Sequence, residues 1–205
     1  MEKIKTLFAH RIFKILKWAF FVLLLLYLIL VVVRVFHFFN LDKTNAAVAK
    51  IHATKLTLDD ALGANLPPDP GEKADDTIAG FDVNQNGIRD DVELAIFAEY
   101  PNSAKTRAVL LQYALVLQMQ MTLPIINKDT ATAVAEEDSR SYDCIGVIVP
   151  RSDDDLEKIK LLRVFVENKQ INTTTRKNKQ ENYFDYIESY TLQSGCDIDL
   201  FTLPN

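Results

Sequence analysis

The chain has 205 residues, of which 48% are hydrophobic, and its 23 Lys and Arg and 28 Asp and Glu give a formal net charge of −5. The charge is unevenly distributed. Residues 1–42 carry six Lys/Arg and two Asp/Glu (+4), which leaves 17 and 26 (−9) for residues 43–205. An acidic C-terminal part repels phosphate backbones, so the composition argues against nucleic-acid binding.

A long apolar stretch runs from Trp18 to Phe39, interrupted only by Arg34 and His37. As a helix it would be about 33 Å long at ~1.5 Å per residue, enough to cross a hydrocarbon core of ~30 Å. The alternative is a cleaved signal peptide. Such a peptide has an apolar core of only ~7–15 residues followed closely by small residues, and here the nearest small-residue pattern is at 47–49. We therefore predict an uncleaved transmembrane helix over 18–39, in contact with the lipid bilayer.

The cations around this span predict its orientation. Only Arg34 and Lys43 lie close behind the span, whereas five cations precede it: Lys3, Lys5, Arg11, Lys14 and Lys17. By the positive-inside rule, residues 1–17 form a cytoplasmic basic segment and the C-terminal part lies outside the cytoplasm.

Residues 40–80 have the pattern of a stalk with short helical pieces. Thr57 and Asp60 have the spacing of a capping box, and Gly63 is a stop signal for the short helix between them. Three prolines and a glycine then occur within residues 66–71, which excludes a continuous helix or a central strand. We expect this stretch to separate the stalk from a folded domain over 81–205.

The domain opens with DVNQNGIRDDVE, which fits the pattern of a twelve-residue calcium loop. Gly87 falls at position six, where such a loop turns sharply. The predicted metal ligands are the side chains of Asp82, Asn84, Asn86, Asp90 and Glu93 and the backbone carbonyl of Ile88. Three carboxylates in an unpaired loop suggest a dissociation constant on the order of 10⁻⁴ M. We therefore expect a structural Ca²⁺ rather than a cytosolic sensor.

The loop departs from a full EF-hand in two respects. A Pro- and Gly-containing segment stands where the entering helix should be, and Arg89 occupies position eight, which is usually aliphatic. It resembles instead the loop-plus-exit-helix calcium motifs of dockerins and thrombospondin-type repeats. A metal-free alternative also exists: Asn86-Gly87 is a turn signal, and Asp90 with Glu93 has the spacing of a capping box. That alternative leaves the alternation of Asp82, Asn84 and Asn86 unexplained.

The rest of the chain predicts about five helices and an all-α domain. The pattern indicates helices over 92–100, 103–122, 129–149, 156–169 and 172–195. Apolar residues surround most of the second of these, which predicts a central, buried helix. Residues 144–149 (CIGVIV) have a strand as an alternative, and Asp153, Asp154 and Asp155 are explained by helix capping rather than by a metal site.

The only two cysteines, Cys144 and Cys196, both lie in the predicted extracytoplasmic part. In an oxidising compartment an even pair indicates a disulfide. Closing a loop of roughly fifty residues should contribute about 4 kcal/mol in the chain-entropy description. A redox or metal pair is disfavoured because the sequence has no CxxC motif.

The run LPPDPGEKADDTIAGFDVNQNGIRDDVELAI resembles a segment of exported or membrane-anchored proteins of Gram-negative bacteria, in which a proline-rich stretch leads into an Asp/Asn/Gly loop ending RDDVE. The similarity extends loosely over residues 66–196, through Asn172, Thr173, Arg176 and Tyr183. It implies a bacterial inner-membrane protein with a periplasmic domain and a calcium loop. No enzymatic activity is implied by it.

Catalytic motifs are absent from the sequence, which contains no GxSxG, HExxH, P-loop or GxGxxG. We expect the three histidines, His10, His37 and His52, to lie in the cytoplasmic segment, the membrane and the stalk, out of reach of any cleft in the domain. The sequence thus predicts a non-enzymatic, membrane-anchored protein with a protein-interaction or envelope-assembly role, and it leaves the partner and the oligomeric state open. The alternative is an extracytoplasmic hydrolase that uses carboxylates or the calcium site.

Overall fold

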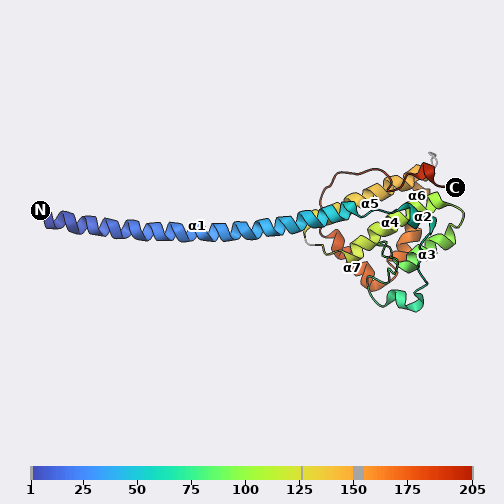
Figure 1. Cartoon of the computed structure of the whole chain (residues 1–205), viewed down its shortest axis with the longest axis horizontal. Coiled ribbons are helices and arrows are strands. Elements are labelled where there is room, and N and C mark those ends of the chain that lie inside the picture. The colour runs from blue at the N-terminus through green and yellow to red at the C-terminus, as the bar shows by residue number, and fades with distance from the viewer. Residues whose placement is uncertain (1, 126, 150–154, 205) are drawn as a thin grey trace. The chain divides into compact units, whose positions relative to one another are not determined.

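The computed structural model describes residues 2–125, 127–149 and 155–204, with side chains from residue 13 onward. These residues form seven α-helices and two short 3₁₀-helices and contain no strand, so the all-α prediction is confirmed (Figure 1). The chain divides into two compact units, Met1–Ala46 and Ala47–Asn205.

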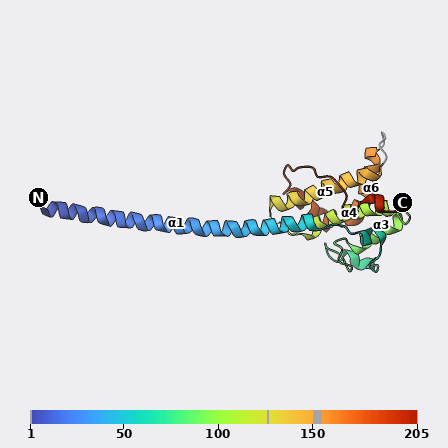
Figure 2. The same cartoon turned by 45° about the horizontal axis from the view of Figure 1, so that its top comes forward.

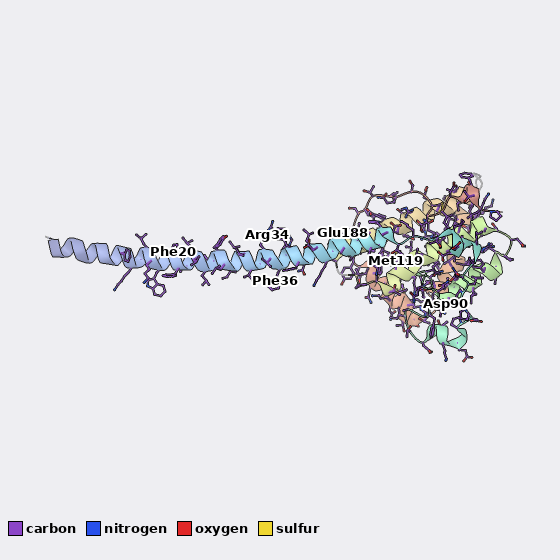
Figure 3. The ribbon with its side chains drawn as sticks, in the orientation of Figure 1. Phe20, Arg34, Phe36, Asp90, Met119 and Glu188 are labelled. Atoms are coloured by element: carbon purple, nitrogen blue, oxygen red, sulfur yellow. A yellow bond between two sulfur atoms is a disulfide. The ribbon has the colours of Figure 1, made fainter. Side chains whose placement is uncertain are left out.

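A single helix, α1 (Glu2–Ala53), accounts for the first unit and enters the second. Its portion from Phe13 onward contains an 18-residue window with a mean hydropathy of 2.9 and is, within the described residues, the one helix long and apolar enough to cross a membrane. Phe20 and Phe36 project from the ribbon and are 62% and 66% exposed (Figure 3). The predicted span, 18–39, lies within α1, which continues without a break through 40–53.

The second unit is built around α4 (Ala104–Thr122), which starts after an N-cap at Ser103. Nearly all of its residues are buried, as its all-round apolar pattern predicts. Five other helices contact it: α2 (Leu58–Leu62), α3 (Asp90–Glu99), α5 (Lys128–Ile148), α6 (Asp155–Gln170) and α7 (Thr174–Phe184) (Figures 1 and 2).

The predicted stalk is not a separate element in this structure. The expected capping box of Thr57 and Asp60 is present, and Gly63 ends α2 with φ +76°. However, Leu56 and Ala61 are buried in the same hydrophobic core as α4, because α2 packs against that helix. The proline-rich stretch leads into a 3₁₀-helix, Gly71–Asp75. Residues 47–80 thus contribute to the second unit rather than preceding it.

Helix α7 is shorter than its sequence pattern predicts. It begins at Thr174, after an N-cap at Thr173, but ends at Phe184 instead of continuing to Gly195. The following segment has to reach Cys144 on α5, and a non-helical chain covers about twice as much distance per residue as a helix. This prediction was wrong for that reason.

The C-terminal segment is fastened to α5 by the predicted disulfide, Cys144–Cys196, with a Cα–Cα distance of 4.9 Å. Two hydrogen bonds extend the attachment: the backbone N–H of Gln193 donates to Ser139 Oγ and that of Gly195 donates to Asp143 Oδ2, both at 2.8 Å. Cys144 is fully buried. Because α5 extends to Ile148, residues 144–148 are helical and the strand alternative is wrong. Asp153 and Asp154 lie outside the described residues, and α6 begins at Asp155.

Candidate functional site

The loop over residues 82–89 turns around the carboxylate of Asp82. This carboxylate accepts the backbone N–H groups of Asn86 and Gly87, each at 3.0 Å. Gly87 has φ +83°, and a Cβ placed on it would lie 2.7 Å from Leu115 Cδ1 of α4. Only glycine combines this backbone conformation with so close an approach. The sharp turn predicted at Gly87 is therefore present, and it rests against the central helix.

The side chains of Asn84 and Asn86 stabilise the same loop. Asn86 Oδ1 accepts the backbone N–H of Ile88 at 2.9 Å, which makes a local turn. Asn84 Nδ2 donates to the carbonyl oxygen of Asn65 and to Glu93 Oε2, both at 3.0 Å. Asn86 thus stabilises the turn within the loop, and Asn84 links the loop to the segment after α2 and to α3.

Asp90 reaches back into the loop rather than capping α3. Its Oδ1 accepts the backbone N–H of Val83 at 3.0 Å, while its own N–H donates to Phe81 O at 2.9 Å. The N-cap of α3 is Arg89, which makes no side-chain capping hydrogen bond, so the capping-box alternative is wrong. Burial raises the pKa of Asp90; the Val83 N–H opposes this shift, and the charge of Asp82 reinforces it.

Glu93, like Asp90 and Ile88, is almost fully enclosed. It is 1% exposed, and burial raises the pKa of its carboxyl to about 7. The hydrogen bond from the Asn84 amide opposes this rise, whereas the charges of Asp60 and Asp90 add to it. Asn86 Nδ2 is itself buried without a hydrogen-bond partner among the described residues. The acidic side of the loop is thus crowded with negative charge that only amide N–H groups offset.

The structure therefore brings Asp82, Asn84, Asp90 and Glu93 within electrostatic or hydrogen-bonding reach of one another. Ile88 follows on the same loop with its side chain fully buried. In the described part of the chain, no group of three or more His, Cys, Asp or Glu side chains converges closely enough to hold a metal. A cation at this loop would accordingly need the amide and backbone oxygens as well as the carboxylates.

Sequence reasoning did not anticipate the role of Arg89. Its side chain is fully buried and donates to the carbonyl oxygens of Lys169 and Gln170, at 2.6 and 3.1 Å, at the C-terminal end of α6. It also donates to the carboxylate of Asp91, at 2.8 Å. A cationic side chain at the C-terminus of a helix donates hydrogen bonds to the last carbonyl groups and interacts favourably with the helix dipole. Arg89, which departs from the EF-hand pattern at position eight, thus joins the loop to α6.

Asn172, Thr173, Arg176 and Tyr183, the four residues singled out beyond the loop, have structural roles. Thr173 caps α7. Arg176 is fully buried and donates to the carbonyl oxygens of Ala74, Thr77 and Ile78. Asn172 and Arg176 both donate to Asp75, and Tyr183 donates to Ala131 O at 3.2 Å. The contacts of Asn172 and Arg176 thus fasten residues 74–78, just before the loop, to the start of α7.

His52 lies against α5 instead of standing apart in a stalk, which corrects our expectation. Its Nδ1 is 2.7 Å from Glu137 Oε1, and Lys55 Nζ is 2.6 Å from Glu137 Oε2. Arg140 pairs with both Glu137 and Asp197. Burial alone would raise the pKa of Glu137, but these hydrogen bonds and charges hold it below its usual value. The cluster therefore connects the end of α1, α5 and the C-terminal segment.

A cavity of about 690 Å³ adjoins the loop within the second unit. The loop contributes residues 82 and 84–87 to its wall, and the end of α1 contributes Lys50 and Ile51. Leu115 and Met119 of α4, of which Met119 is labelled in Figure 3, are also in the lining. Three of the six candidate metal ligands, Asp82, Asn84 and Asn86, therefore border a space large enough for a ligand.

No family model matches the chain, and neither a curated protein nor a solved structure shows significant similarity to it.

Proposed function

We propose that this chain is a single-pass membrane protein whose extracytoplasmic helical domain is braced by one structural Ca²⁺ at residues 82–93 and serves in protein interaction or envelope assembly. The observation that carries the calcium part is the environment of Glu93. This buried carboxylate lies close to Asp60 and Asp90, and the groups that offset its charge are amides. A divalent cation would neutralise all three acids at once.

The donor set fits calcium better than a transition metal. Carboxylate, amide and backbone oxygens are the ligands that hard cations prefer, and the loop contains neither His nor Cys. Asp82, Asn84, Asn86, Asp90 and Glu93 would supply side-chain oxygens and Ile88 its carbonyl. The amide of Asn84, which now donates to Glu93, would present its oxygen instead. The ion would hold the start of α3 to the loop.

Three features support the membrane topology. The helix α1 is apolar enough to span a bilayer, and the preceding segment holds most of the nearby Lys and Arg. The disulfide between Cys144 and Cys196 fits an oxidising compartment, which for a bacterial inner-membrane protein is the periplasm. With the acidic balance of residues 43–205, these features favour a protein partner over nucleic acid.

The test is a calorimetric calcium titration of the full chain in lipid nanodiscs after removal of divalent ions. We expect one site with a dissociation constant on the order of 10⁻⁴ M. The variant Glu93→Gln should lose this heat, whereas Glu181→Gln, at an exposed position of α7, should retain it. Equal heats in Glu93→Gln and the unmodified chain, or no heat in either, would refute the calcium site.

A further inference from the structure

The cavity beside the loop combines an apolar floor with polar walls. Its volume of about 690 Å³ falls in the range of roughly 300–1,000 Å³ that is typical of ligand sites. Leu115, Met119 and Leu123, from α4 and the residue that follows it, provide apolar lining, and methionine adapts to differently shaped side chains. A ligand with an apolar group would therefore be accommodated on this side.

The walls present both acceptors and donors. Asp60, beyond its bonds to Thr57, and Gln85 of the loop supply acceptor oxygens. Lys50 also lines the cavity, and its Nζ has no ion pair or hydrogen bond within the described residues. Lys55, by contrast, is already held by Glu137 at 2.6 Å. Lys50 is thus the cation in the lining that is available to an anionic group.

The combination of apolar and polar residues in the lining favours some classes of ligand over others. An acyl chain would cover the polar walls without replacing their hydrogen bonds to water, which costs free energy. A polyanion such as a nucleotide would face the negative charges of Asp60 and Asp82. A peptide end offers N–H donors, C=O acceptors, an apolar side chain and one carboxylate, and each has a counterpart in the lining.

We propose that the cavity binds the free C-terminal end of a partner polypeptide. The terminal carboxylate pairs with Lys50, the last side chain, which is apolar, packs on Leu115 and Met119, and backbone N–H groups donate to Asp60 and Gln85. This inference rests on the proposed role as a protein-interaction domain and specifies the chemistry of the partner. Leu115 also contacts Gly87, so the loop and the cavity share a wall.

The test uses the full chain in nanodiscs and fluorescein-labelled Ala-rich hexapeptides that end in Ala, Val, Leu, Ile, Met or Phe with a free carboxylate. Fluorescence anisotropy should show saturable binding of at least one large-apolar peptide with a dissociation constant below about 1 mM, over empty nanodiscs as the blank. Its C-terminal amide should bind about fivefold more weakly, and Lys50→Met should cause a similar loss. Lys177→Met, at an exposed position of α7, is the matched control and should bind normally.

A second pair of variants tests the place of binding. Ala47→Trp inserts a ring into the cavity from a position that is not fully buried and should abolish binding, whereas Ala49→Trp, on the same helix but outside the cavity lining, should not. Binding that ignores both Ala47→Trp and Lys50→Met, or no saturable binding of any hexapeptide with or without calcium, would overturn the proposal. Peptide binding without a calcium heat would refute the metal site alone, and a calcium heat without peptide binding would refute the peptide site alone.

Discussion

The side-chain amide of Asn84 lies 3.0 Å from Glu93 Oε2, and this hydrogen bond spans the loop to join its third position to its twelfth. The same amide nitrogen lies 3.0 Å from Asn65 O, so one side chain ties the loop to both α3 and the segment after α2. An amide N–H carries only a partial positive charge, and it faces a buried carboxylate with two acidic neighbours. Within the loop, Glu93 is thus the carboxylate whose negative charge is least offset by nearby groups.

The turn at Gly87 should tolerate no side chain. Gly87→Ala would place a Cβ at φ +83° and 2.7 Å from Leu115, so we expect a loss of about 3 kcal/mol in the free energy of unfolding. Gly71→Ala is the matched control, since Gly71 also has a positive φ, +59°, but nothing lies within 4 Å of its Cβ position. It should cost about 1 kcal/mol. Chemical denaturation followed by circular dichroism would compare the two, and equal losses would contradict the close contact with Leu115.

The buried guanidinium of Arg89 should be irreplaceable by lysine. A lysine provides one ammonium where Arg89 reaches Lys169 O, Gln170 O and Asp91 together. We expect Arg89→Lys to lower the free energy of unfolding by about 3 kcal/mol, because the carbonyls at the end of α6 lose their donors. Lys169→Arg, which changes an exposed side chain at the same helix end, should be neutral. The same denaturation assay measures both variants, and a neutral Arg89→Lys would show that the contact with α6 contributes little.

Stability should depend on pH through Asp75. The hydrogen bond from Asn172 is the main cause that lowers the pKa of Asp75, and Arg176 adds to it against a smaller effect of burial. Because the folded pKa lies below the unfolded value of about 4, the contribution is complete above that value and is lost as pH falls through the folded pKa. Asp75→Asn should therefore flatten the acid limb of a stability curve below about pH 4, whereas Asp76→Asn should leave it unchanged. Identical acid limbs in Asp75→Asn and the unmodified chain would count against the link.

The disulfide should contribute most of its stabilisation by restricting the unfolded chain. It closes a loop with a sequence separation of 52, for which the chain-entropy description gives about 4 kcal/mol. Reductant should lower the unfolding midpoint of the native chain, while the double variant Cys144→Ser/Cys196→Ser should start from the lower value and not respond. A reductant-insensitive native chain would mean that the two cysteines are not bonded.

Local sequence signals sufficed for much of the fold. Ser103, Thr57 and Thr173 are cap residues whose hydrogen bonds involve neighbours three positions away, so their roles are readable from a short window. The turn at Gly87 was likewise predictable from a short window, because Asn-Gly is a turn signal. The sole cysteine pair left one possible disulfide, and that prediction is confirmed.

Long-range packing accounts for what the sequence could not show. Leu56 and Ala61 looked like parts of a stalk because nothing nearby in sequence predicts that α4 covers them. Arg89 and Arg176 are fully buried because carbonyl groups some 80 to 102 residues away in the chain accept their hydrogen bonds. An unusual residue at a motif position, such as Arg89 at position eight, was the only local sign of such a role.

The central claim is that one divalent ion is held by the loop that opens α3. Crystals of the full chain grown with calcium and measured for anomalous scattering test it most directly. We expect a single peak at about 2.3–2.6 Å from oxygens of Asp82, Asp90 and Glu93, with the Ile88 carbonyl as a further ligand. A calcium-rich crystal with no peak there, and with the carboxylates of Asp82 and Glu93 turned away from each other, would contradict it.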